Sequence, residues 1–248
     1  MDLSFLRETL QRLLMGVPLT LKLAGTSVVL GFMIALTLAM ALQSKRPLFV
    51  WPVRGFVAAF RGTPLLAQIF LIYYGLGQFR PFFQATGVWG FFREPFWCAI
   101  LALTLNTAAY GAEIIRGGLQ SVPFGQMEAA RACGMSPWLV YRRIALPIAL
   151  RQALPSYGNE IILMIKGTSL ASIITLAEVT GIAQQIISQT YRAIEVFACA
   201  GAIYLVMNFA IARLIGWLEY YLSPHRRPAP DLLHSASAEG AALWSRNQ

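Results

Sequence analysis

Four charged residues stand inside stretches that are otherwise almost wholly apolar: Arg61, Glu113, Glu160 and Lys166. A charge at the centre of a membrane helix costs about 2.5 to 3.5 kcal/mol on insertion scales, so it usually faces a protein interior or a water-filled path. Further hydrogen-bonding groups beside the last two come from Asn159, Thr168 and Ser169. These residue types indicate a place where a polar solute could be held within a membrane.

The spacing of Glu160 and Lys166 limits how they can act. Six positions on an unbroken helix correspond to about 600° of rotation, so the two side chains point to opposite sides and cannot form a simple ion pair. Each needs its own partner on another span or subunit. The alternative is that they hold helices together. For Arg61 and Glu113 we favour snorkelling or structural pairing, and Thr63 and Pro64 indicate a helix restart.

Signals for catalysis or cofactor binding are missing from the sequence. The fragment nearest to a phosphate-binding loop, Lys166 to Ser169, lacks the upstream glycine. The two histidines, His225 and His234, are near the C-terminus, and the three cysteines are scattered without metal-ligand spacing. We therefore expect no enzyme activity, and no cofactor or metal bound by this chain.

Composition places the chain in a bilayer. Hydrophobic residues make up 57% and charged residues 12%, too few polar groups to cover a soluble globule of 248 residues. About 20 apolar residues cross the hydrocarbon layer. This rule predicts an all-α integral membrane protein with five transmembrane helices: Leu23–Leu42, Phe56–Leu76 with a kink or restart at Pro64, Phe96–Ile115, Ala153–Ala177 and Val196–Ile215.

The distribution of Lys and Arg predicts the orientation. With the N-terminus outside, the inner segments hold three, five and three Lys or Arg residues, against five in the outer segments. The N-terminus is therefore expected outside and the C-terminus inside. This topology also explains the net charge of +9 better than nucleic-acid binding, which we exclude.

The two ends of the chain and the connection between the second and third spans are not predicted to cross the membrane. Residues 1–16 carry leucines at helical spacing and are expected to lie along the outer interface, with no signal peptide. The aromatic stretch at residues 81–92 is too short to cross and is predicted to be interfacial. Residues 17–222 form the transmembrane domain, and residues 223–248 are predicted to be a mobile cytoplasmic tail.

The longest charged loop, Gly125 to Pro147, predicts two short helices joined by a glycine. Phe124 to Cys133 has a helix-forming composition, and Gly134 suits a C-terminal cap. Ser136 and Pro137 then suit the start of a second helix, expected to end near Pro147. An amphipathic connector lying on lipid is an alternative for this loop.

Several motifs in order resemble one family. The segments EAARACG followed by IALP, RGTPLLAQIFLIYYGLG, LALTLNTAAYGAEIIRGG and LPSYGNEIILMIKGTSL are similar to permeases of the polar amino-acid ABC importers, particularly the histidine, basic amino-acid and opine permeases. The resemblance runs from about Leu19 to Trp217.

The resemblance implies that transport and ATP hydrolysis are carried out by separate subunits. The loop would be the coupling helix, or EAA loop, between spans three and four, docking on a cytoplasmic ABC ATPase dimer that binds ATP and Mg. A second, similar permease or a second copy would complete the pathway in the bacterial inner membrane, and a periplasmic amino-acid-binding protein would deliver the substrate. The residues matched to the coupling role are Glu128, Ala129, Ala130, Arg131 and Gly134.

The predicted substrate pathway comprises Asn159, Glu160, Lys166, Thr168, Ser169 and Arg61. For Arg131 and its neighbours Arg142 and Arg143, contact with lipid headgroups is an equal alternative to pairing with partner acids. Two other functions stay open at this point. One is a secondary transporter or channel driven by an ion gradient, with Glu160 and Lys166 as coupling groups. The other is a membrane scaffold that recruits a cytoplasmic protein.

Overall fold

The computed structural model describes residues 3–44 and 46–222, and all regular structure within these ranges is helical. The predicted tail, residues 223–248 with both histidines, lies outside the described residues. In chain order the elements are α1 (Leu3–Leu14), α2 (Val17–Leu42), α3 (Pro47–Gly62), α4 (Leu65–Phe70), the π-helix η1 (Leu71–Gly75), α5 (Arg80–Ala85), α6 (Trp89–Phe92), α7 (Pro95–Gln120), α8 (Phe124–Ala132), α9 (Pro137–Val140), the π-helix η2 (Tyr141–Ala145), α10 (Leu146–Gly167), the 3-10 helix η3 (Thr168–Ile174), α11 (Val179–Thr190) and α12 (Ala193–Leu222).

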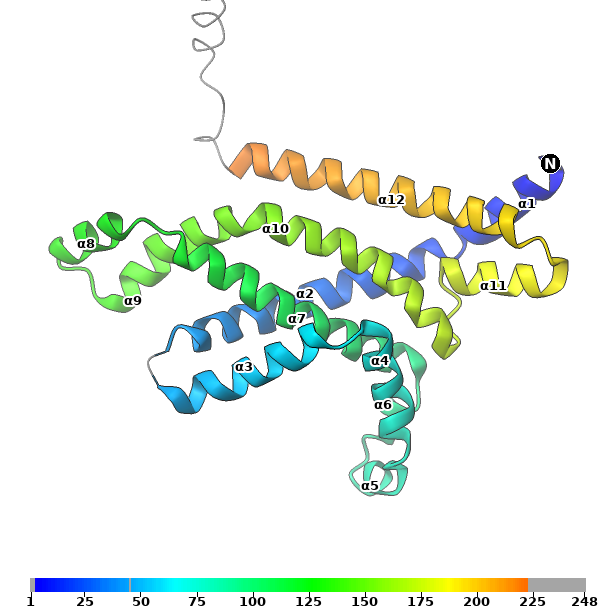
Figure 1. The fold of residues 1–248 in the computed structure, drawn as a ribbon, viewed down its shortest axis with the longest axis horizontal. Helices are drawn as coiled ribbons and strands as arrows, with labels where there is room; N and C mark the ends of the chain where they lie inside the picture. Colours follow the sequence, from blue (N-terminus) through cyan, green and yellow to red (C-terminus); the bar gives the residue numbers. More distant parts are fainter. Residues whose placement is uncertain (1–2, 45, 223–248) are drawn as a thin grey trace, which may run out of the picture.

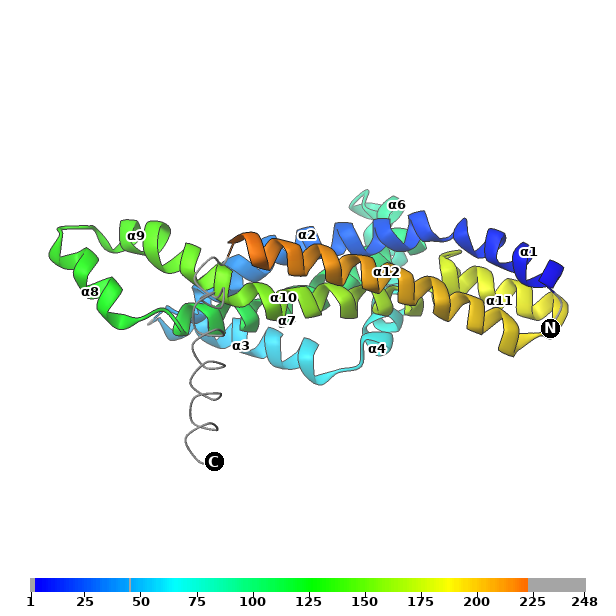
Figure 2. The same ribbon diagram turned by 90° about the horizontal axis from the view of Figure 1, so that it is seen from above.

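The helices form an elongated bundle around α7, which packs against α2, α3 and α10. Of the most apolar stretch of α7, 72% is buried inside the protein, whereas only 22% of the corresponding stretch of α12, on the outside, is buried. Figure 1 shows α8 and α9 at one end of the bundle, with the α2–α3 connection and the end of α12 directed toward the same end. Figure 2 shows α1 and α11 together at the opposite end.

Small residues bring the backbones of the central helices into close contact. A Cβ atom added at Gly31 of α2 would lie 2.7 Å from Cγ2 of Thr107 on α7. One added at Gly118 of α7 would lie 2.5 Å from the carbonyl oxygen of Ala149 on α10. Neither position has room for a side chain, so α2, α7 and α10 are packed as one block.

Three stretches are long and apolar enough to cross a membrane, and the number rises to five if each of two bent helix pairs counts as one span. The single stretches are Leu3–Leu42, Pro95–Gln120 and Ala193–Leu222. They contain the predicted first, third and fifth spans. The bent pairs correspond to the other two predictions.

The predicted second span differs from the structure in its start and its shape. The helix begins at Pro47 rather than Phe56, and it bends by 109° between Gly62 and Leu65. The break confirms the restart predicted from Thr63 and Pro64. Its physical cause is that Pro64 lacks an N–H and forces the preceding residue, Thr63, into an extended conformation.

The predicted fourth span is also longer and bent. Its helix starts upstream of Ala153, passes Pro155 without ending, and bends by 47° before α11, which we did not predict. Thr175 at φ 70° ends η3, and the extended Glu178 caps α11 by accepting a hydrogen bond from the Gly181 amide. The bend therefore depends on local capping that hydropathy does not record.

The other two irregular predictions fall on short helices. The aromatic stretch at residues 81–92 falls on α5 and α6, which project from the side of the bundle in Figure 1. Helix α1 covers the predicted N-terminal segment and buries Leu13 against α11 and α12. Leu3 and Leu10 remain exposed, so part of the leucine stripe is not covered by this chain.

Candidate functional site

The break between α3 and α4 is held by the side chain of Gln68. Its Nε2 donates to the carbonyl oxygen of Phe60 at 2.7 Å, to that of Thr63 at 3.1 Å and to the Thr63 hydroxyl at 2.9 Å. Asn106 on α7 donates its amide to Oε1 of Gln68 at 3.0 Å. The carbonyl groups at the end of α3 have no helical partner. Gln68 replaces that partner, and Asn106 fixes the amide.

A cavity of about 260 Å³ lies beside this break. One wall is the backbone turn itself, and the facing walls come from α7 and α10. Glu160 is the acidic residue that lines the cavity, and its side chain is buried at 6% exposure. Among the described residues no hydrogen bond or ion pair reaches its carboxylate. The full lining is Thr63, Pro64, Leu65, Asn106, Tyr110, Glu160, Leu163 and Met164.

Arg61 connects this cavity to a second one. Its guanidinium lies 5.3 Å from the centre of the Tyr110 ring, and Tyr110 donates its hydroxyl to the Arg61 carbonyl at 3.5 Å. Tyr110, which lines the cavity together with Glu160, thus lies against Arg61, but Arg61 itself is not among the residues that line this cavity.

The other predicted pathway residues are not brought into this cavity. Asn159 and Lys166 are exposed and do not line it, whereas Glu160 is buried, so Glu160 and Lys166 lie on different sides of the helix as their spacing predicts. Thr168 donates its hydroxyl to the Ile165 carbonyl at 2.7 Å. Ser169 likewise donates its hydroxyl within its own turn, which leaves neither hydroxyl proton free for a solute.

Sequence analysis missed Gln68, Asn106 and Tyr110 as site residues. Asn106 is a polar residue in a predicted span, and Gln68 follows Pro64 by four positions within an apolar run. Because a buried amide in a membrane helix needs a partner, each of these two residues could have been predicted to need one, but the sequence does not show that they pair with each other.

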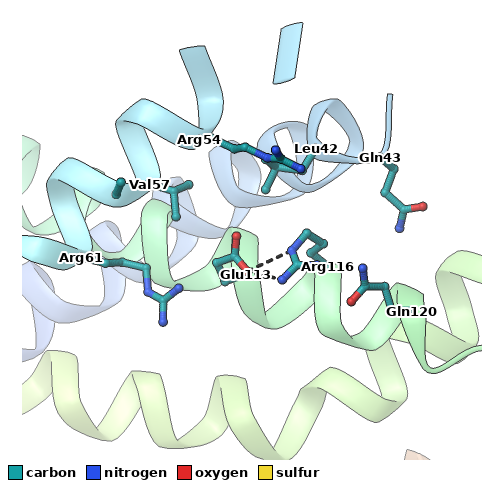
Figure 3. A pocket seen from close by; sticks show the side chains of 9 residues that line it. Leu42, Gln43, Arg54, Val57, Arg61, Glu113, Arg116 and Gln120 are labelled. Atoms are coloured by element: carbon teal, nitrogen blue, oxygen red, sulfur yellow. Dashed lines mark hydrogen bonds and ion pairs between the residues drawn. The ribbon is translucent and has the colours of Figure 1, made fainter. Parts of the chain in front are cut away.

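The second cavity, of about 520 Å³, lies between the ends of α2, α3 and α7. Figure 3 shows three arginines around Glu113, which forms an ion pair of 2.6 Å with Arg116. Glu113 therefore has a structural partner, in line with our preference for pairing. The lining residues are Leu42, Gln43, Arg54, Val57, Ala58, Arg61, Glu113, Arg116 and Gln120.

The predicted coupling loop has the expected first helix and glycine cap. Helix α8 ends at Ala132, and Gly134 has φ +78°, which confirms the left-handed cap that favours glycine. Glu128, Ala129 and Arg131 are exposed. Ala130, which was also matched to the coupling role, is instead buried within this chain and is not available for contact with a partner.

The second loop helix begins as predicted but does not end at Pro147. Ser136 caps α9 by accepting a hydrogen bond from the Leu139 amide, and Pro137 follows at the first helical position. The π-helix η2 then leads directly into α10, with Pro147 near its start. Pro147 therefore falls in the first turn of α10, directly after the wider π turn, where its missing N–H is tolerated and the helical path continues.

These features define a class first: an all-helical, multi-pass membrane protein with polar cavities beside a broken helix and a capped helical loop at one end. Residues 25–222 match the family described as the binding-protein-dependent transport system inner membrane component, and the chain belongs to this family. It is thus a permease subunit of an ABC importer and a multi-pass protein of the inner membrane.

Individual relatives and one solved structure agree with this membership. The octopine transport system permease protein of Rhizobium meliloti is 58% identical over 96% of this chain and 97% of its own length. The histidine/lysine/arginine/ornithine transport system permease protein of Escherichia coli (strain K12) is 40% identical over 86% of this chain and 90% of its own. A crystal structure of an amino acid ABC transporter with histidines superposes with a TM-score of 0.79 at 35% identity, covering 89% of this chain and 99% of that one.

Proposed function

We propose that this permease carries basic amino acids or opines inward through a path that passes the Glu160 cavity. The printed names of its relatives, which include octopine and arginine systems, support this substrate class. The observation that carries the proposal is the buried Glu160 carboxylate, which faces a cavity and has no hydrogen-bond donor among the described residues. Such a carboxylate is suited to an ammonium or guanidinium group of a solute.

The position of the cavity supports this role. A broken helix exposes backbone groups where they can line a cavity, and membrane transporters use such breaks at substrate sites. Here the backbone at Thr63 and Pro64 forms one wall, and Gln68 keeps the turn in place. Glu160 lies opposite on α10. The solute would contact a fixed turn on one side and a charged group on the other.

We further propose that α8 and α9 couple the permease to a cytoplasmic ATPase dimer that binds ATP and Mg. The exposed Glu128, Ala129 and Arg131 would contact this partner, and Gly134 would set the angle between the two loop helices. A second permease, either distinct or another copy, would enclose the path. A periplasmic binding protein would supply the substrate.

The proposed topology has five crossings, with the N-terminus outside and the C-terminus inside. Figure 1 supports it, because the α2–α3 connection, the α8–α9 loop and the end of α12, all predicted to be inside, lie toward one end of the bundle. Helix α1 and the aromatic α5 and α6 would contact lipid at the outer interface.

Uptake in vesicles tests the proposal against an ion-driven transporter and a scaffold. The purified permease, its cognate partners and the binding protein are reconstituted, and uptake of radiolabelled L-arginine and octopine is measured. We expect uptake to require enclosed ATP and the ATPase and to persist when ionophores remove ion gradients. Uptake that follows an ion gradient without ATP would establish the secondary transporter instead. If the complete complex takes up neither L-arginine nor octopine, the proposed substrate class is contradicted.

A further inference from the structure

The 520 Å³ cavity is built from two polar helix faces that oppose each other. On α3, Arg54, Ala58 and Arg61 are spaced four and three residues apart, which places them on one side of the helix. On α7, Glu113 and Arg116 follow the same kind of spacing, and Gln120 extends the row. The two faces thus direct their polar groups into one space rather than along two unrelated surfaces (Figure 3).

The charge in this cavity is unbalanced. Three guanidinium groups and one carboxylate leave a net charge of +2 among its lining residues. Arg116 is paired with Glu113, but no ion pair joins Arg54 or Arg61 to an acid among the described residues. A concave site with an excess of one sign of charge concentrates ions of the opposite sign. Its volume is also within the range of small-molecule sites.

The cavity is adjacent to the one that contains Glu160. Arg61 lines the larger cavity, while Thr63, Pro64 and Leu65, two to four positions further along the chain, line the smaller. Tyr110 lies under the Arg61 guanidinium and also lines the smaller cavity. An acidic site and a cationic site therefore share one boundary, the end of α3.

We infer that the arginine cavity binds the carboxylate groups of the transported solute, while its cationic end is held at Glu160. This inference rests on the proposed function and extends it to a site lined by Arg54, Arg61 and Arg116. Guanidinium groups recognise carboxylates through paired, charge-assisted hydrogen bonds. An amino acid offers one carboxylate, and octopine, an arginine derivative with an added carboxyethyl group, offers two.

Binding to the assembled permease and ATPase, without the binding protein, tests this assignment. The complex is placed in phosphatidylcholine nanodiscs at pH 6, and the affinities of L-arginine and L-argininamide are measured. The two probes share the guanidinium and the ammonium and differ only in the carboxylate. We expect the wild-type complex to bind L-arginine about tenfold more tightly, because a charge-assisted hydrogen bond contributes enough for a tenfold ratio. The affinity for octopine should exceed the affinity for L-arginine, because octopine offers a second carboxylate.

Substitutions then locate the effect. Arg54→Gln should reduce the preference for L-arginine over L-argininamide to about threefold and leave L-argininamide affinity unchanged. Glu113→Gln should raise the preference about two- to threefold, because it removes the cavity's negative charge. Arg46→Gln is the matched control, since Arg46 is exposed at the start of the same helix but does not line the cavity. Its preference should equal that of the wild type.

Two results would overturn the inference. One is an equal affinity of the wild-type complex for both probes, or an unchanged preference in the Arg54 variant. The other is loss of the preference when phosphatidylglycerol is added to the nanodiscs, which would assign the cavity to a lipid headgroup. Neither result depends on ATP-driven uptake, so the proposed function can survive while this inference fails.

Discussion

Two buried glutamates in this protein have opposite surroundings. Glu178, at the start of α11, is fully buried and receives hydrogen bonds from the Tyr204 hydroxyl at 2.7 Å, the Gly181 amide at 2.8 Å and the Thr20 hydroxyl at 3.4 Å. Glu160, on α10, is almost as buried but receives none from the described residues and faces a cavity.

The difference shows how the surroundings of a buried acid separate structure from function. The hydrogen bonds to Glu178 link α2, α11 and α12, since each donor comes from a different helix. The carboxylate is therefore satisfied within the fold and stabilises it. Glu160 keeps its hydrogen-bonding capacity for something that is not part of the chain. Burial alone does not distinguish the two residues, whereas the count of donors does.

Replacing Glu178 should have the largest effect. Glu178→Leu removes the cap of α11, leaves the buried Gly181 amide without its partner and leaves the Tyr204 hydroxyl with Thr180 alone, so we expect a loss of about 3 kcal/mol in the free energy of unfolding. SDS titration of the purified permease measures this. Uptake per folded molecule in the surviving fraction should stay near the wild-type value. If the variant is stable but does not transport, Glu178 has a role in transport and not only in stability.

Replacing Glu160 should show the reverse pattern. Glu160→Gln keeps the shape and removes the charge, so uptake of L-arginine should fall at least about tenfold while the unfolding free energy changes by less than about 0.5 kcal/mol. Uptake assays and SDS titration on the same preparation check both values. Glu94→Gln is a matched control, because Glu94 is exposed at the start of α7 and lines neither cavity. An unstable Glu160→Gln protein would make this residue structural as well.

A smaller change sharpens the comparison further. Tyr204→Phe removes one donor to Glu178 and leaves the other two, so we expect a loss of about 1 to 2 kcal/mol in unfolding free energy with unchanged uptake per folded molecule. The same titration and uptake assays apply. If stability is unaffected, the Glu178 network does not hold α12 in place as described.

The sequence predicted those parts of the fold that depend on local physics. Long apolar runs located α2, α7 and α12, Pro64 located the break, and Gly134 located the left-handed cap. Each of these depends on neighbours within a few residues, where steric limits and hydrogen bonding act directly.

Features that depend on distant partners were missed. Gln68 and Asn106 are 38 positions apart, and Thr20 and Glu178 are 158 positions apart. No spacing rule connects such residues before the helices are packed. Pro147 illustrates the related case in which local preference is overridden, since the helix continues through a π turn whose Tyr141 and Ala145 lie in one apolar cluster with residues of α7. The arginine cavity is intermediate: its rows have helical spacing, but their opposition appears only in the fold.

The uninterrupted helical path from α9 through η2 into α10 has a mechanical consequence. From Pro137 to Glu160 the path spans about 35 Å at 1.5 Å per residue. Since α10 is also packed tightly against α7 at Gly118, little of a displacement at the loop can be absorbed by compression along the way. Under the proposed function, a displacement of α9 therefore moves the carboxylate of Glu160 with it. Release of the solute would follow from rigid movement of one helix, and no series of changed side-chain contacts is needed between the loop and the cavity.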